Sequence, residues 1–191
     1  MNQLQVEDQI FEAKDFSTDP IRGEAYENCT FVRCSFTNAD LSNRRFIECI
    51  FNDCDLSNAK LHKTTLNDIK FVGCKLLGLH FENCSEFLFT VSFENCTVDF
   101  SSFYKRSLKK TAFVNSSLKE VDFTEADLTN SIFDNCDLAK ALFENTVLEK
   151  ADLRTAFHYS IDPELNRIKK AKFSAAGIAG LLAKYDIVID L

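Results

Sequence analysis

Cysteine is the residue type through which this chain could most readily do chemistry, because thiolates bind metals and form disulfides. Eight cysteines occur in 191 residues. Most are separated by multiples of five residues, with one slip: Cys29, Cys34, Cys49, Cys54, Cys74, Cys96 and Cys136. These intervals match no zinc finger or ribbon, and the N-terminus lacks the basic flank and apolar segment of a secretory signal. We therefore predict buried, reduced thiols in a cytoplasmic protein that binds no metal or cofactor.

Other catalytic groups are sparse and scattered. The three histidines, His62, His80 and His158, have no Cys or Ser at a spacing that suggests a nucleophile pair. No glycine-rich phosphate loop and no Gly-x-Ser-x-Gly turn occurs. Carboxylates are plentiful, but the repeat described below puts them on the outside of a filled rod, which has no cleft to desolvate a pair of them. The sequence predicts that the protein is not an enzyme.

Acidic side chains dominate one stretch of a chain whose formal net charge is −7 at pH 7. Six carboxylates with no Lys or Arg among them define an acidic band: Glu120, Asp122, Glu125, Asp127, Asp134 and Asp137. A basic cluster precedes it: Lys105, Arg106, Lys109, Lys110 and Lys119. Net acidity disfavours nucleic acid as a direct partner and favours a basic protein that binds the acidic band. The alternative interpretation is an ordinary solvated surface.

A five-residue repeat positions all of these groups. Between residues 29 and 153 a large apolar residue, here called the central residue, recurs at every fifth position, as in Phe31, Phe36 and Leu41. The residue two places before it is small, and the other three are mostly polar. This period fits neither helical spacing nor strand alternation, so we predict a short strand and a corner in every five residues. Four such faces close one coil of about twenty residues, stacked at the ~4.8 Å spacing of neighbouring strands.

The central residues also sort into columns. Taking every fourth one gives a column made only of phenylalanine: Phe31, Phe51, Phe71, Phe93, Phe113 and Phe133. The column on the opposite face is also rich in Phe, and the two between them are mostly Leu, which would fill a square core evenly. The second residue after the central one is often Asn, Asp or Gly, the residues that tolerate left-handed geometry. We predict the corners there.

The stretch resembles the pentapeptide-repeat family, whose pattern is roughly A(D/N)LXX. Near-verbatim copies are Ala-Asp-Leu-Ser-Asn at 39–43, Ala-Asp-Leu-Thr-Asn at 126–130 and Ala-Asp-Leu-Arg-Thr at 151–155. The resemblance implies an all-β fold, a right-handed quadrilateral β-helix that forms a solenoid. We divide the chain into an N-terminal cap at 1–28, the β-helix at 29–158, and a C-terminal segment at 159–191 that leads out into a helix and a strand.

The repeat slips by two residues within 82–92. The simplest interpretation is a bulged face rather than a projecting loop. The functional alternative is a binding bump formed by Phe87 and Phe89, one of which should face outward. Phe100 falls at a corner and Tyr104 directly after a central residue, so both should be exposed. Together these residues define a predicted exposed aromatic patch: Phe87, Phe89, Phe100 and Tyr104.

The C-terminal segment contains Asp162-Pro163, the pair Leu181-Leu182 and the run Ile187-Val188-Ile189. In these features it resembles the end of the quinolone-resistance pentapeptide proteins, in which a helix and a terminal strand form a two-fold dimer. We expect a short α-helix near 175–185, with Ser174 as its N-cap, followed by a strand at 187–189. The predicted homodimer interface contains Ile178, Leu181, Leu182, Tyr185, Ile187 and Ile189. The alternative is that the helix only caps its own β-helix.

Two functions fit the sequence. The resemblance to the quinolone-resistance proteins implies a DNA mimic that binds a type II topoisomerase, DNA gyrase or topoisomerase IV, and protects it from quinolones. The alternative is an interaction or scaffold protein of unknown target, since the repeat specifies a fold rather than a task. No apolar run approaches the ~18 residues of a membrane span, so we expect no membrane association.

Overall fold

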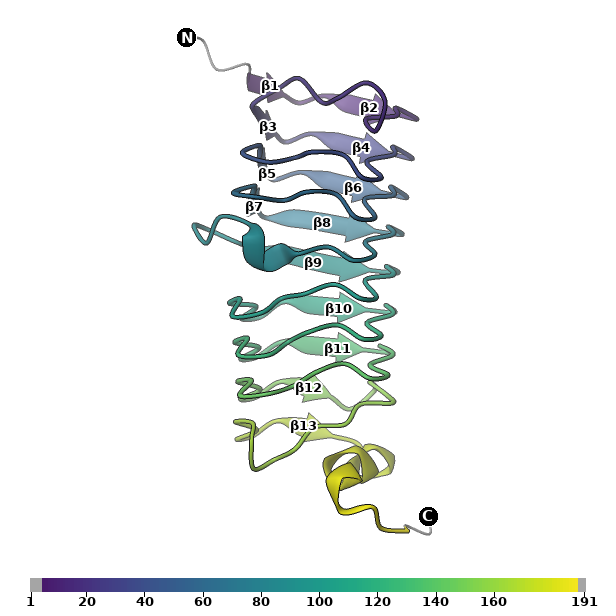
Figure 1. Cartoon of the computed structure of the whole chain (residues 1–191), viewed down its shortest axis with the longest axis vertical. Helices are drawn as coiled ribbons and strands as arrows, with labels where there is room; N and C mark the ends of the chain where they lie inside the picture. Colours follow the sequence, from purple (N-terminus) through teal and green to yellow (C-terminus); the bar gives the residue numbers. More distant parts are fainter. Residues whose placement is uncertain (1–4, 189–191) are drawn as a thin grey trace.

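The computed structural model describes residues 5–188 and shows one long rod wound from short parallel strands (Figure 1). Each strand pairs with the strand twenty residues away, as in Phe31 with Phe51 and Phe113 with Phe133. Across the slip the offset is twenty-two, because Phe71 pairs with Phe93. The predicted solenoid of stacked parallel coils is confirmed.

Two of the four faces carry regular sheets, and every pairing in them is parallel. The larger sheet contains β2 (Ile10–Glu12), β4 (Thr30–Val32), β6 (Ile50–Asn52), β8 (Ile69–Val72), β9 (Val91–Glu94), β10 (Ala112–Val114), β11 (Ile132–Asp134), β12 (Asp152–Leu153) and β13 (Lys172–Phe173). The smaller sheet contains β1 (Gln5–Glu7), β3 (Ala25–Glu27), β5 (Arg45–Ile47) and β7 (Thr65–Asn67). The other two faces are held by isolated parallel bridges, such as Ser35 to Asp55 and Asp40 to Lys60.

The central residues fill the rod as predicted. In the Phe column, the ring of Phe113 stacks on Phe93 and on Phe133 with centroids 5.0 Å apart. Rings of the opposite column, Phe103 and Phe123, meet these rings edge-on at about 6 Å. All five rings are fully buried. Stacked and edge-on pairs are both favourable ring geometries, so the interior is close-packed and leaves no central channel.

Corners lie where the sequence placed them. Asn58, Asn130, Gly73 and Gly78 all have left-handed φ values between 56° and 63°. A Cβ atom at Gly73 would lie 2.3 Å from Asp53 Oδ1, so a side chain there would require the Asp53 carboxylate to move. Other corners are left-handed even though their residue type does not favour it, so the coil geometry overrides local preference there.

The small inward position has a hydrogen-bonding role that we did not predict. Cys54 Sγ donates to the carbonyl of Phe31, the central residue of the preceding coil, at 3.3 Å. Cys74 does the same to Phe51, and the hydroxyl of Thr64 donates to Leu41 at 2.9 Å. Alanine also fits this position, as at Ala39 and Ala126, so the donor adds a hydrogen bond rather than being required. Cysteine acts here as a small buried residue that can make that bond.

Residues 5–28, most of the segment that we assigned to an N-terminal cap, already follow the coil. β1 pairs with β3 and β2 with β4 at the same offset of twenty, which places Phe11 against Phe31. The ring of Phe11 stacks on that of Phe31 at 4.9 Å.

The C-terminal helix is not the α-helix that we predicted. The chain instead forms two short 3₁₀ helices, η2 (Ala176–Leu181) and η3 (Ala183–Tyr185). Gly177 and Gly180 weaken an α-helix, and both pack tightly against Tyr159, which favours the narrower form. Ile187 and Val188 belong to no strand, since no neighbouring strand pairs with them, and Ile189 lies outside the described residues. Within 5–188, no helix is both long and apolar enough to cross a membrane.

Candidate partner-binding surface

A loop projects from the rod at the slip, where we had predicted a bulged face. After η1 (Phe81–Asn83), the Ser85 amide donates to Thr64 O at 2.8 Å and the Thr90 amide donates to Leu66 O at 3.0 Å. Between these two anchors the chain leaves the face and turns back at Leu88, whose φ is 55°. Figure 1 shows this loop standing out from the rod between β8 and β9. We call residues 84–90 the slip loop.

The tip of the slip loop is apolar and exposed. Phe87 is 73% exposed and Leu88 is 55% exposed. Phe89 is half-buried, and its ring lies edge-on to that of Phe81 at 6.3 Å. Phe89 therefore does not belong to the exposed aromatic patch, because it packs against the core where the slip interrupts the column of central residues.

Arg106 supports the loop from inside the rod. We had assigned it to the surface basic cluster, but it is only 5% exposed. Its Nε donates to Phe81 O and its Nη2 to Glu82 O, each at 2.8 Å, and Nη2 also donates to Cys84 O. Residue 106 lies two places before the central residue Leu108, so the repeat itself could have predicted an inward side chain.

The other members of the predicted aromatic patch lie on the coil that follows the loop. Phe100 occupies a corner with a φ of 62° and is 59% exposed. Tyr104 is 36% exposed, and its hydroxyl donates to Glu125 Oε1 at 3.2 Å. The ammonium of Lys105 lies 4.8 Å from the Tyr104 ring centroid. Phe100 and Tyr104 are exposed, as predicted, but Tyr104 is held in a polar network.

The six carboxylates of the acidic band do not face one side. Asp122, Asp127, Asp134 and Asp137 each lie on a different face of the rod, because a coil takes only twenty residues. Four members are paired with lysines: Glu120 with Lys140, Glu125 with Lys105, Asp127 with Lys109, and Asp137 with Lys119. Three of those lysines belong to the basic cluster one coil earlier, which therefore offsets much of the charge of the band.

Hydrogen bonds and ion pairs also keep two of these carboxylates, Asp127 and Asp137, ionised. At Asp127, burial alone would raise the pKa, but hydrogen bonds from Thr129 and the ammonium of Lys109 lower it below the ordinary value. At Asp137, burial also acts to raise the pKa, and the bond to His158 together with Lys119 lowers it overall. His158 Nδ1 lies 2.9 Å from Asp137 Oδ1. The band is a set of locally satisfied charges.

The net negative charge of the chain lies elsewhere. Residues 105–191 contain thirteen acidic and thirteen basic residues, whereas residues 1–40 contain eight acidic and three basic ones. In the N-terminal half, Asp8, Glu48 and Asp68 stack along one edge of the rod, with Asn28 between the first two. Asn28 Nδ2 donates to Asp8 Oδ1 at 2.5 Å. We call Asp8, Glu48 and Asp68 the acidic edge.

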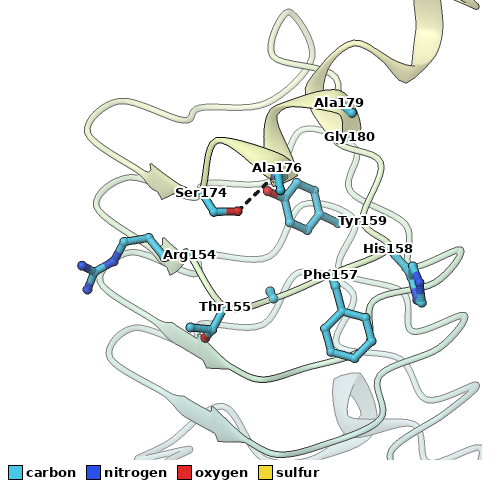
Figure 2. A pocket seen from close by; sticks show the side chains of 11 residues that line it. Arg154, Thr155, Phe157, His158, Tyr159, Ser174, Ala176, Ala179 and Gly180 are labelled. Atoms are coloured by element: carbon cyan, nitrogen blue, oxygen red, sulfur yellow. Dashed lines mark hydrogen bonds between the residues drawn. The ribbon is translucent and has the colours of Figure 1, made fainter. Parts of the chain in front are cut away.

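The C-terminal end of the rod is closed by η2 and η3. A hollow of about 460 Å³ lies between residues 154–159 and η2, and Figure 2 shows the Tyr159 ring on one side of it. Tyr159 is buried, and its hydroxyl has no hydrogen-bond partner among the described residues. Burial raises its pKa. A Cβ at Gly177 would lie 2.0 Å from this hydroxyl, so the glycine is what allows η2 to sit against Tyr159.

Further contacts fasten the same cap. Ser174 Oγ accepts from the Gly177 amide at 3.0 Å (Figure 2), but the N-cap of η2 is Ala175 rather than Ser174 as we predicted. Lys184 forms ion pairs with Asp162 at 2.8 Å and with Glu164 at 2.6 Å. These contacts join residues about twenty positions apart, so η3 is tied to the lead-out segment.

The predicted dimer residues divide into two groups. Leu181 and Leu182 are half-buried, and Leu181 packs against the core of its own rod. Ile178, Tyr185 and Ile187 are about half exposed. Val188, which lies in the segment 187–189 that we predicted to join the interface, is 93% exposed. Exposed apolar side chains of the C-terminal segment include Leu165, Ile178, Tyr185, Ile187 and Val188.

The thiols are enclosed in the rod. All eight cysteines are free and buried. Burial raises the pKa of Cys49 and of Cys136 to about 11, which leaves very little thiolate at neutral pH. Within 5–188, no cluster of three or more His, Cys, Asp or Glu side chains could hold a metal ion. The surface features that remain are the slip loop, the acidic edge and the exposed C-terminal end.

This architecture is similar to that of known proteins. The family model described as a pentapeptide repeat region matches residues 25–85 and 87–156. Among solved structures, trypsin-treated QnrB1, a plasmid-mediated fluoroquinolone resistance protein, is 20% identical over 98% of each chain, with a TM-score of 0.63. HetL, a pentapeptide repeat protein involved in heterocyst differentiation regulation from the cyanobacterium Nostoc sp. strain PCC 7120, is 15% identical over 89% of this chain and 87% of its own, with a TM-score of 0.58. No curated protein sequence matches the chain.

Proposed function

Because the chain belongs to the pentapeptide-repeat family, we propose that it is a non-enzymatic binding protein that takes the place of DNA on a type II topoisomerase, DNA gyrase or topoisomerase IV. The observation that carries the proposal is a filled rod whose net negative charge is concentrated in its N-terminal half. A rod without a deep cleft can act only through its surface. The fold likeness to a fluoroquinolone resistance protein, over 98% of both chains, suggests which partner to test first.

The acidic edge is the surface that we assign to the topoisomerase. Neighbouring coils stack at ~4.8 Å, so Glu48 and Asp68 present carboxylates at a short, regular interval along the rod. Regularly spaced negative charge would complement a groove that is basic because it binds duplex DNA. The acidic band at 120–137 contributes less, since the lysines of the basic cluster neutralise it.

Three further features complete the proposal. The slip loop adds an apolar contact through Phe87 and Leu88. The exposed C-terminal end makes a homodimer about a two-fold axis, which matches the symmetry of a topoisomerase. The protein acts in the cytoplasm, where it competes with DNA and protects the enzyme from quinolones.

The test is binding to DNA gyrase, together with supercoiling assays with and without a fluoroquinolone. Binding should weaken steeply as salt rises above ~0.15 M, because exposed charges are screened over ~8 Å there. Reversing Glu48 and Asp68 to Lys should weaken binding at least about tenfold by removing charge complementarity. The matched control reverses Glu125 and Asp127, which are already paired with lysines, and should have a smaller effect.

The second candidate function is a scaffold or interaction protein with another target. The observation that favours it is the neutrality of residues 105–191, which leaves half of the rod without DNA-like charge. HetL, which has a comparable fold, is described as taking part in heterocyst differentiation regulation. The absence of gyrase binding, inhibition and protection at micromolar concentrations of this protein would contradict the topoisomerase proposal in favour of this candidate.

A further inference from the structure

We propose that Arg106 is a positioning residue that holds the slip loop in the shape that displays Phe87 and Leu88 to a protein partner. The identity of that partner rests on the function proposed above. The positioning itself rests on the contacts of Arg106, which can be tested without any partner.

Arg106 lies next to the place where the repeat is broken. At the equivalent inward position, other coils carry smaller residues such as Thr64, Ala126 and Thr146, and one earlier coil also carries an arginine, Arg44. The threonines each donate one hydrogen bond to a carbonyl of the preceding coil. Arg106 extends this pattern, because one guanidinium donates to three carbonyls within residues 81–84.

Two of these carbonyls have no other donor. Phe81 O also accepts from the Cys84 amide at 3.1 Å, whereas Glu82 O and Cys84 O, at the end of η1 and just after it, accept among the described residues only from Arg106. No carboxylate of the described residues lies within ion-pair distance of Arg106, so carbonyl dipoles balance its buried charge. Removing the guanidinium would leave buried carbonyls without partners on the outgoing side of the loop.

Arg106 also touches the returning side of the loop. The centre of its guanidinium lies 5.2 Å from the centroid of the Phe89 ring, within the range of a cation–π contact. One side chain therefore ties both stems, residues 81–84 and Phe89, to the coil below. Only 85–88 are left between these attachments, and the two exposed apolar side chains lie there.

A tip held in this way suits a protein partner with an apolar pocket. Phe87 and Leu88 are presented together, and aromatic side chains that fill pockets often dominate binding energy. Because the stems are already fixed, ordering the loop costs little further entropy on binding. Without Arg106 the same residues would be present but not displayed, so affinity would fall although the rod remained folded.

The first experiment measures hydrogen exchange in the full-length protein. In Arg106→Ala, the Ser85 and Thr90 amides, which anchor the loop, should exchange at least about tenfold faster, while β10 and β11 keep their protection. Arg44→Ala is the matched control, since Arg44 occupies an equivalent inward position away from the slip and its Nε has no hydrogen-bond partner. Unchanged exchange at Ser85 and Thr90 in Arg106→Ala would overturn the proposal.

The second experiment is a double-mutant cycle for binding to DNA gyrase, with Arg106→Ala and the tip variant Phe87→Ala/Leu88→Ala. Arg106→Ala should weaken binding about tenfold when the tip is intact and have little effect when the tip is truncated. Equal weakening in both backgrounds would mean that Arg106 acts on the rod as a whole, which contradicts positioning. If Arg106→Ala does not fold, Arg106→Lys replaces it and should give the same pattern at smaller size.

The two experiments separate the inference from the proposed function. If the unmodified protein does not bind gyrase, the topoisomerase assignment fails, and the exchange experiment alone decides whether Arg106 positions the loop. If gyrase binds and the tip variant binds equally well, the slip loop is not a contact surface and the proposal is wrong.

Discussion

Replacing Phe113 with alanine should destabilise the protein by several kcal/mol, because this ring lies in the middle of the stacked core. Phe113 is fully buried, between Phe93 and Phe133 at 5.0 Å, and it meets Phe103 and Phe123 edge-on at 6.1 and 6.0 Å. Truncating a buried Phe to Ala typically costs ~3–5 kcal/mol, part of which comes from ring pairs worth ~0.5–1.5 kcal/mol each.

Thermal unfolding measures the effect. At ~2–4 °C per kcal/mol for a chain of this length, the melting temperature should fall by roughly 6–20 °C. Phe100→Ala is the matched control, since it removes the same ring from a corner where that ring is 59% exposed. A substitution at such a surface site should change stability by no more than about 0.5 kcal/mol.

The comparison of these two variants is decisive for the column assignment. Equal stability losses for Phe113→Ala and Phe100→Ala would mean that the inward and corner positions have been confused. Phe113→Asp extends the test, because it would bury an unpaired charge among stacked rings and should prevent folding. Normal expression of that variant with an unchanged melting temperature would refute the stacking argument.

Three other predictions concern assembly, thiols and acid stability. In sedimentation experiments the unmodified protein should be a dimer, and the Ile178→Glu variant should be a folded monomer. If the unmodified protein is a monomer at high concentration, η2 and η3 serve only as a cap. A thiol reagent should label the eight buried cysteines slowly in native buffer, and rapid labelling would contradict their burial. The pKa of Asp152 is lowered from 3.8 to about 2, chiefly by hydrogen bonds from Arg154, so its stabilising contribution is complete above pH ~4 and is lost as pH falls toward ~2. Asp152→Asn should therefore flatten acid unfolding in that range, and an unchanged pH profile would refute this assignment.

The rod could be predicted from sequence because one physical constraint repeats. Strands in neighbouring coils must lie at ~4.8 Å, so a residue twenty positions away is always a neighbour and the core pattern is copied from coil to coil. The Phe column follows from that rule, and the left-handed corners follow from the Asn and Gly residues that recur at the same interval. The same rule places Arg106 inside the rod, whereas its charge had suggested the surface.

The features that break the repeat could not be predicted in this way. The slip shows how many extra residues are present, but it does not show whether they pack into the face or project from it. Phe87 and Phe89 are the same residue type two positions apart, yet only Phe87 is exposed. The spacing of Ile178 and Leu181 fits an α-helix and a 3₁₀ helix equally well. Packing of Gly177 against Tyr159, eighteen residues earlier, favours the latter.

The acidic band shows why charge in a solenoid must be judged between coils rather than along the chain. The eighteen residues at 120–137 contain six charges, all negative, and wind almost once around the rod. Three of these carboxylates pair with lysines about twenty positions earlier, and Glu120 pairs with Lys140, twenty positions later. In the C-terminal half the acidic and basic residues are equal in number, and the N-terminal half carries the net negative charge. A dimer formed through the C-terminal ends would therefore carry its two acidic edges toward its far ends. A partner attracted by charge should then offer two separated basic surfaces, which a two-fold topoisomerase would supply and a single basic patch would not.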